Sequence, residues 1–284
     1  MKLEILPVYR RLQEYVAGAE SNPADAAVLW ERYAVEPYWK LLSCYAPFDL
    51  SARKPQPILD IPALKIQLER LGAMDLRALQ AEFEETAALL PADDDDTIYV
   101  ALYPLSDDRA VVKERQNGVL GDSLFGNIAI HVNPLAEDFA AWIPYVFAHE
   151  YHHAVWGGYW YVRHGGELAG EFVDSLLSEG QADSFALSRY PDLRPEWLFS
   201  LSDDQANTLW ADQYAGRMFL QDVDTCKYMF GDEAGGIPWC AGYAVGFGIV
   251  QAFLRKHPGT TARQLLEIRP ADILKQSGYG RPRA

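Results

Sequence analysis

Residues 147–156, FAHEYHHAVW, contain three of the six histidines of the chain and one glutamate. Within this segment His149, Glu150 and His153 fit the pattern H-E-x-x-H. Residues four apart on a helix lie on one face about a turn apart, so both imidazoles can bind the same metal ion. Glu150 follows about 100° around the helix, which places its carboxylate beside the ion. A general base for an attacking water molecule is needed at that place.

A third ligand is expected further along the chain, because catalytic zinc usually has three protein ligands and one open position. The segment LLSEGQADSFA (176–186) contains Glu179 and, four residues later, Asp183. Both side chains would lie on one face of a second helix. We predict that Glu179 binds the metal. Asp183 would accept the second ring N–H of a ligand histidine and so fix its tautomer.

Other third ligands are less well supported by the spacing. A metzincin requires Gly and then His at fixed offsets after the second histidine, where this chain has Trp156 and Tyr159. The remaining candidates lack an acceptor placed to support a ligand histidine, as Asp183 would. These candidates are Glu167, Glu171, Asp174 and His164, of which His164 lies in a predicted loop.

His152 lies one residue away from the predicted ligand pair. If it paired with His149 instead, Glu150 would lose its role as the base. We therefore expect His152 to be an exposed or hydrogen-bonded residue on the flank of the helix.

The elements that must position these residues follow from local periodicity. Helices are expected over most of the first ninety residues, with a break near Gly72, and strands over 97–105 and 126–134. The segment between the two strands contains another possible strand. We predict an α+β, predominantly helical fold with a small mixed or antiparallel sheet. It would comprise an N-terminal helical region, 1–94, and a catalytic domain, 95–284.

The helix that carries the histidines is expected to begin near Pro144, because proline is tolerated in a first helical turn. The helix of Glu179 is expected from about Leu168 to Tyr190. Near the C-terminus, the glycines of WCAGYAVGFGIVQAFLRKH (239–257) would let another backbone come close. These are Gly242, Gly246 and Gly248.

Composition narrows the classes of partner and compartment. The formal net charge of −15 disfavours binding to nucleic acid or to anionic membrane surfaces. Three widely spaced cysteines suit a reducing compartment, and the N-terminus has no apolar signal-peptide core, so we expect a cytoplasmic protein. The apolar stretch 235–254 is expected to be a packed helix instead of a membrane span. The acidic run Asp93–Asp96 is expected to be a solvated turn, with calcium binding as the less favoured alternative.

The motifs together resemble those of a known group. H-E-x-x-H followed by Glu179 and Asp183 resembles the gluzincins, the thermolysin-like metallopeptidases. With IPWCAGYAVGFGIV (237–250), which is similar to a Gly-Tyr-x-x-Gly helix, the chain resembles the YjaZ-like bacterial family of predicted Zn-dependent proteases over roughly residues 95–270. The resemblance implies a zincin-like core and one Zn²⁺ per chain. It implies His149, His153 and Glu179 as its ligands and Glu150 as the catalytic base.

The resemblance also suggests residues that would contact the substrate. In thermolysin-like folds an edge strand borders the cleft and pairs with an extended peptide, a role that it implies for residues 126–132. His131 on this strand is a candidate substrate contact. Tyr243, which precedes Gly246 in the family-like helix, is the candidate donor to the developing oxyanion, with Tyr228 behind it. A packed core aromatic is the alternative for Tyr243.

These observations predict a zinc-dependent peptidase that hydrolyses peptide or protein substrates. Glu150 would accept the proton of the attacking water and pass it to the leaving amine. The alternative is a zinc-containing peptide-binding or chaperone-like protein without efficient proteolysis, using its aromatic-rich N-terminal helices. A purely structural zinc site would need four protein ligands, and the sequence contains no closed Cys/His set.

Overall fold

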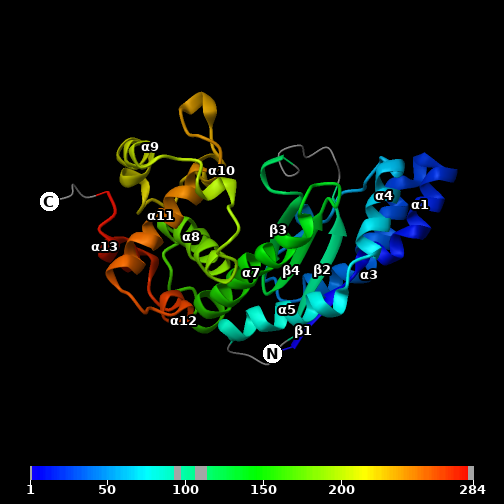
Figure 1. Ribbon diagram of the computed structural model, residues 1–284, viewed down its shortest axis with the longest axis horizontal. Coiled ribbons are helices and arrows are strands. Elements are labelled where there is room, and N and C mark those ends of the chain that lie inside the picture. The colour runs from blue at the N-terminus through cyan, green and yellow to red at the C-terminus, as the bar shows by residue number, and fades with distance from the viewer. Residues whose placement is uncertain (1, 93–96, 106–113, 281–284) are drawn as a thin grey trace. The chain divides into compact units, whose positions relative to one another are not determined.

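The computed structural model describes residues 2–92, 97–105 and 114–280. The chain forms two compact units, Met1–Val155 and Trp156–Ala284, and each is described by itself. The first unit contains the sheet and the N-terminal helices, and the second is built from helices (Figure 1). The α+β, predominantly helical fold predicted from the sequence is thus confirmed. The acidic run Asp93–Asp96 lies outside the described residues.

The sheet of the first unit is mixed and has the strand order β1-β2-β4-β3. Both β1 (Lys2–Leu6) and β4 (Asn127–Val132) run parallel to β2 (Thr97–Pro104). The antiparallel partner of β4 is β3 (Val119–Leu124). The strands β2 and β4 lie where the sequence predicts them, whereas β1 is an additional strand in a region expected to be helical. Parallel pairing of β1 with β2 needs a long crossover, which the N-terminal helices supply.

β4 is an interior strand of this sheet. It lies between β2 and β3, and Ile128, Ala129 and Ile130 are almost completely buried. The edge-strand position expected for residues 126–132 is therefore wrong, and β3 is the edge strand on this side. The continuous apolar run in the sequence of β4 is typical of a strand buried on both faces.

The N-terminal helices of the first unit begin at well-defined caps. Asp60 accepts the backbone N–H of Ala63 at 3.0 Å, and Asp75 accepts that of Arg77 at 3.0 Å. The helix that is capped by Asp60 ends at Gly72, where the sequence predicts a break. The helices are α1 (Leu12–Ser21), α2 (Ala26–Trp30), α3 (Glu36–Leu42), α4 (Ile61–Gly72) and α5 (Leu76–Leu89).

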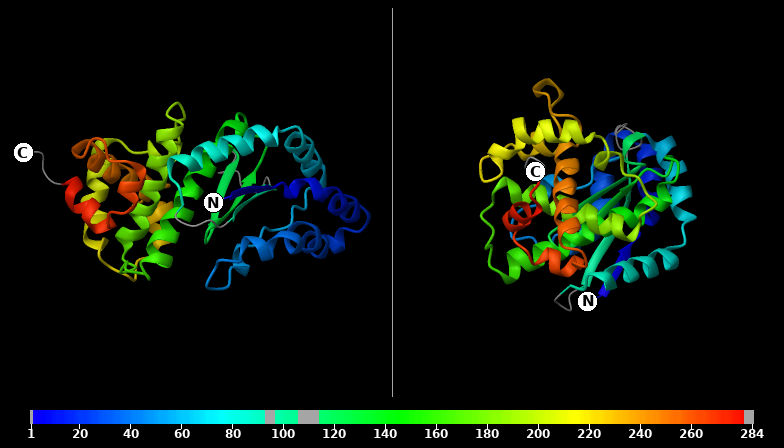
Figure 2. Two further views of the ribbon diagram at one scale, coloured as in Figure 1. Left: turned by 90° about the horizontal axis from the view of Figure 1, so that it is seen from below. Right: turned by 60° about the vertical axis from the view of Figure 1, so that its left-hand side comes forward.

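The helix α5 packs against both the sheet and the histidine-bearing helix α7 (Phe139–Gly157). Figure 2 shows α5 running alongside the sheet, and Gln80 donates to the Leu3 carbonyl of β1 at 3.1 Å. Its Phe83 ring stacks on Phe147 of α7 with centroids 3.8 Å apart. Tyr151 of α7 donates to the Leu90 carbonyl at 2.9 Å. These buried contacts fix the rotation of α7 about its own axis.

α7 begins at Phe139, more than a turn before the expected start near Pro144. Pro144 lies inside the helix, where it cannot donate a hydrogen bond to the carbonyl of Ala140. The surrounding residues Ile143 and Tyr145 are fully buried. Packing of this apolar segment therefore outweighs the preference of proline for a first turn.

The second unit is organised around α8 (Phe172–Arg189) and α11 (Ala241–Lys256). Both agree with the helices predicted from the sequence. None of the described helices is both long and apolar enough to span a membrane. Smaller helices surround this pair: α9 (Asp203–Leu209), α10 (Thr225–Phe230), α12 (Ala262–Leu266) and α13 (Pro270–Ser277).

Glycines allow α8 and α11 to approach each other at backbone distance. A Cβ atom at Gly180 would lie 2.9 Å from the backbone nitrogen of Phe247 and closer still to the carbonyl of Gly246. A Cβ atom at Gly246 would meet the carbonyl oxygen of Leu176. The predicted close approach at Gly246 is confirmed, and it fixes the segment of α8 that carries Glu179.

The two other glycines predicted to permit close approach differ from each other. A Cβ atom at Gly242 would lie 2.6 Å from the Tyr228 carbonyl oxygen, so a backbone does come close there. At Gly248 the neighbour is the side chain of Tyr279, at 3.2 Å. Gly248 therefore makes room for a ring.

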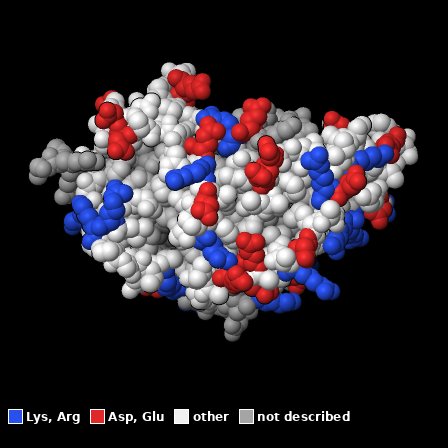
Figure 3. All heavy atoms as spheres, in the orientation of Figure 1, with Lys and Arg blue, Asp and Glu red and all other residues white. Residues whose placement is uncertain are grey.

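Charged side chains of both signs occupy the surface. On the face drawn in Figure 3, acidic and basic residues are interspersed among uncharged ones. The exclusion of nucleic acid and membrane partners stays a prediction from the net charge of −15.

Candidate metal centre

The two histidines of the H-E-x-x-H motif lie together on α7. Their Nε2 atoms are 3.0 Å apart, and their ring centroids are 4.7 Å apart. Two nitrogens bound to one zinc ion at about 2.0–2.1 Å in tetrahedral geometry are separated by about 3.3 Å. His149 and His153 are therefore spaced closely enough to share an ion.

Glu150 lies between these two histidines in the sequence and is only 8% exposed. Its side chain packs against Gly121 of the edge strand β3. Gly121 carries no signal in the sequence, because a lone glycine in a strand gives no indication of its distant neighbour. The base predicted at position 150 is thus a buried carboxylate beside the sheet edge.

His152 was expected to be exposed or hydrogen-bonded; it is only 1% exposed, so the first alternative is wrong, and the second stays a prediction. Its ring centroid lies 6.3 Å from that of His153, at an interplanar angle of 77°. The neighbouring residues Tyr151 and Val155 are also buried. α7 is covered on most of its circumference, and a flank position is therefore not a solvent position.

Glu179 and Asp183 lie one turn apart on α8. Glu179 is half-buried, whereas Asp183 is completely buried. The indole Nε1 of Trp197 donates to both carboxylate oxygens of Asp183, at 3.2 and 3.3 Å. A buried carboxylate needs such donors, because burial without them disfavours the charged form. Trp197, in the 3₁₀ helix Glu196–Leu198, was not predicted, since its sequence neighbours give no sign of this contact.

One ligand atom from each of His149, His153 and Glu179 lies within 4.8 Å of the others. Among the described residues, these three form a group that is able to hold a metal ion. Two imidazole nitrogens and one carboxylate oxygen are the donor set of catalytic zinc sites that keep one position open. The residues present therefore fit the zinc ion that the sequence predicts.

The competing acidic residues and His164 have local structural contacts. The Asp174 side chain accepts the backbone N–H of Glu171 at 3.1 Å at the start of α8. Glu167 forms an ion pair with Arg269 at 2.9 Å, and His164 lies 3.8 Å from Glu167. Burial raises the pKa of Asp174, consistent with a carboxylate enclosed at a helix terminus.

Tyr243 lies on α11 and packs against the core of the second unit. Its ring centroid is 5.7 Å from that of Phe230. Tyr228, in the same core, is 9% exposed, with the Arg217 guanidinium 5.0 Å from its ring centroid. The oxyanion role of Tyr243 stays a prediction.

His131 lies on the interior strand β4, in register between Tyr103 of β2 and Leu120 of β3. Its ring stacks on Tyr103 with centroids 5.4 Å apart. Contact of His131 with substrate stays a prediction, without the edge-strand argument on which it rested.

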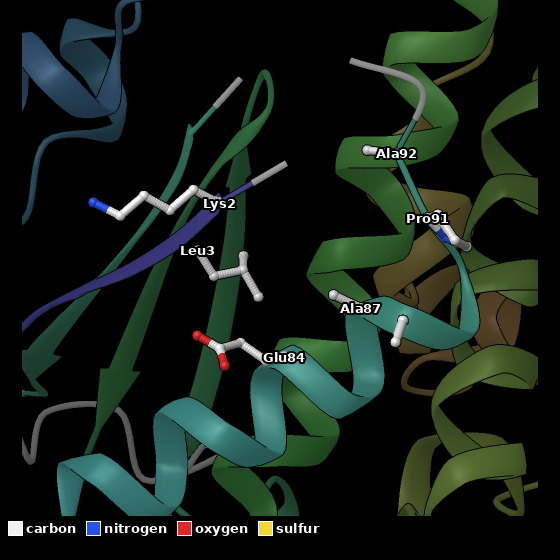
Figure 4. A pocket seen from close by; sticks show the side chains of 7 residues that line it. Lys2, Leu3, Glu84, Ala87, Pro91 and Ala92 are labelled. Atoms are coloured by element: carbon white, nitrogen blue, oxygen red, sulfur yellow. The ribbon is translucent and has the colours of Figure 1, made fainter. Parts of the chain in front are cut away.

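A hollow of about 420 Å³ lies elsewhere in the first unit, between the start of β1 and the end of α5 (Figure 4). None of the predicted site residues lines it. Its walls are formed by Lys2, Leu3, Glu84, Ala87, Ala88, Pro91 and Ala92.

Comparison with known proteins agrees with this chemistry. The chain is 30% identical over 164 residues to Uncharacterized protein YjfC of Bacillus subtilis (strain 168). This match covers 54% of the chain and 52% of the relative, so the chain spans about half of that protein. No solved structure matches the chain. A family model described as "Predicted Zn-dependent protease" matches residues 77–275, a range that contains every predicted metal ligand. The chain therefore belongs to the family of predicted Zn-dependent proteases, DUF2268.

Proposed function

We propose that this protein is a zinc-dependent peptidase of the gluzincin type that binds one zinc ion per chain. The observation that carries the proposal is the grouping of His149, His153 and Glu179 around a possible metal position. Glu150 follows the first of these ligands and belongs to the same helix. Membership of a family of predicted Zn-dependent proteases supports both the metal and the reaction class.

The residues of the chain would divide the chemistry as follows. Zinc, when bound, would supply the Lewis acidity that makes water a nucleophile near neutral pH. Glu150 accepts a proton from the attacking water at its carboxylate and delivers it to the leaving nitrogen. Asp183, held by Trp197, accepts the second ring N–H of a ligand histidine and fixes its tautomer. Tyr243 donates a hydrogen bond to the developing oxyanion.

Peptides or proteins are the proposed substrates, and the cytoplasm is the proposed compartment. The acidic net charge supports a partner other than nucleic acid or an anionic membrane. The odd number and wide spacing of Cys44, Cys226 and Cys240 support a reducing environment.

Metal analysis of the purified full chain, combined with cleavage of a mixed peptide library, tests the proposal. We expect about one zinc per chain. Cleavage should be lost with a chelator and restored by added zinc. Stoichiometric zinc without chelator-sensitive cleavage would instead support the peptide-binding alternative. Chelator-resistant cleavage by a zinc-free protein would overturn the proposed mechanism.

A further inference from the structure

Gly121 of β3 occupies a position where any side chain would collide with Glu150. An ideal Cβ atom at Gly121 would lie 2.6 Å from Glu150 Cδ and closer still to its Cγ and Oε1. Real Cβ atoms essentially never approach a heavy atom this closely. The carboxylate of Glu150 therefore occupies the volume that a side chain at position 121 would fill.

The backbone of Gly121 does not itself require glycine. The glycines flanking the strand, Gly118 and Gly126, have φ values of 76° and 103°, which L-residues rarely adopt. Gly121 is not among the positive-φ residues, and it pairs in regular register with Ile130 of β4. Contact with Glu150 is thus the reason in this structure for a glycine at position 121.

The edge strand β3 is fixed by contacts along its backbone and at its side chains. β3 pairs with β4 along its whole length, Val119 to Leu124. On the other side, Arg53 Nη1 donates to Asp122 Oδ1 at 2.8 Å and to the Ser123 carbonyl at 3.2 Å. The atoms that a Cβ at Gly121 would meet belong to the Glu150 side chain and not to a backbone, so the collision would be relieved by displacing that side chain.

We propose that Gly121 is a positioning residue. Because it has no side chain, the Glu150 carboxylate can lie against the edge strand, and this contact sets the direction of the carboxylate. The inference rests on the proposed role of Glu150 as the general base. Gly121 would thus influence catalysis through Glu150, without touching substrate or metal itself. A misplacement of about 1 Å in a reacting group can lower the rate about 100-fold.

The contact is tested first by stability, without reference to activity. At a strand position with ordinary backbone angles, Gly→Ala without a collision should stabilise the fold, since it restricts the unfolded chain. We expect Gly121→Ala to lower the urea midpoint of the wild-type protein. In a Glu150→Ala background, which removes Cγ, Cδ and Oε1, the same substitution should leave the midpoint unchanged or raise it. Equal shifts in the two backgrounds would overturn the inference.

The consequence for catalysis is tested with the zinc-loaded full chain. We expect Gly121→Ala to retain the wild-type zinc content and KM, while kcat falls by about 10- to 100-fold. Gly72→Ala is the matched control, because a Cβ atom there has no neighbour within 4 Å, and its kcat should be unchanged. A wild-type kcat in Gly121→Ala would overturn the positioning role while leaving the peptidase function intact.

Failure of the proposed function has a different signature. In that case the wild-type protein shows no chelator-sensitive cleavage, and the catalytic role of Gly121 falls with it. The stability measurements would still decide whether Gly121 and Glu150 are in contact.

Discussion

The Nε2 atoms of His149 and His153 lie 3.0 Å apart on α7. At this distance two imidazoles can direct their lone pairs at one cation, and replacing either leaves an incomplete ligand set. We expect His149→Ala, His153→Ala and Glu179→Gln each to weaken zinc binding by more than about 100-fold. Loss of a residue that only supports a ligand costs up to about 100-fold, and loss of a ligand itself should cost more. Competition with a chromophoric chelator measures the affinity.

His164→Ala is the control for these ligand variants. This histidine is partly exposed, lies 3.8 Å from Glu167 and is outside the metal group. Its replacement should leave the zinc affinity unchanged. Wild-type affinity in any of the three ligand variants would contradict the assignment of that ligand.

The Trp197–Asp183 hydrogen bonds predict a second effect on metal affinity. Trp197→Phe removes the donor to both oxygens of Asp183, so the carboxylate that orients a ligand histidine is less well held. We expect a 10- to 100-fold loss of zinc affinity for Asp183→Asn, about the usual effect of outer partners, and a smaller loss for Trp197→Phe.

Trp160→Phe is a matched control in the same unit. Trp160 is also buried and donates its indole N–H to the Leu266 carbonyl at 3.0 Å. Its replacement should lower stability to a similar extent without changing zinc affinity. Equal losses of zinc affinity in Trp197→Phe and Trp160→Phe would show a general structural effect instead.

The proposed oxyanion donor predicts a specific kinetic change. Tyr243→Phe keeps the ring packed beside Phe230 but removes the hydroxyl. We expect kcat to fall by about 100-fold with KM and zinc content unchanged, since the interaction acts only in the transition state. Steady-state kinetics of Tyr243→Phe and Tyr228→Phe compare the two tyrosines. A normal kcat in Tyr243→Phe would identify it as a packed core residue.

Asp122 makes the stability depend on pH with a defined sign. Burial raises the pKa of this carboxyl, and the Arg53 charge only partly offsets the effect. The folded state therefore holds the proton more tightly than the unfolded chain. The contribution of Asp122 to the free energy of unfolding is greatest below the ordinary aspartate pKa of about 3.9. It is lost as pH rises through the raised pKa of Asp122 in the folded state. We therefore expect the wild type to lose its stability advantage over Asp122→Asn as pH rises from about 3.9 through the raised pKa.

Asp49 supplies the opposite case, and urea titrations at a series of pH values measure the effect for both residues. Hydrogen bonds from Ser51 lower the pKa of Asp49, so its contribution is present above the ordinary value and lost as pH falls. The difference between the wild type and Asp49→Asn should therefore rise with pH. A rise for Asp122→Asn as well would contradict the effect of burial described for that residue.

Local sequence patterns were sufficient to locate the helices of the candidate site. The spacing of His149 and His153, and of Glu179 and Asp183, predicts shared faces because helical periodicity is a property of neighbouring residues. The strands β2 and β4 were found for a similar reason, from short β-rich runs bounded by turn residues. These elements need no knowledge of distant contacts.

The features that were missed depend on distant parts of the chain. β4 lies inside the sheet because it pairs with the distant strand β2 on one side and with β3 on the other. The start of α7 before Pro144 follows from burial of the helix. Trp197 and Gly121 are defined by contacts with Asp183 and Glu150 that no local pattern encodes.

Replacement of Glu150 by glutamine tests the central claim most directly. Glutamine keeps the shape of the buried side chain but cannot accept the proton, and Glu167→Gln, at the ion pair with Arg269, is the exposed control. Zinc content and peptide cleavage are measured on the same samples. We predict wild-type zinc in both variants, a loss of kcat of about 10²- to 10⁴-fold in Glu150→Gln, and wild-type kcat in Glu167→Gln. Zinc-loaded Glu150→Gln that cleaves peptides at the wild-type rate would contradict the mechanism.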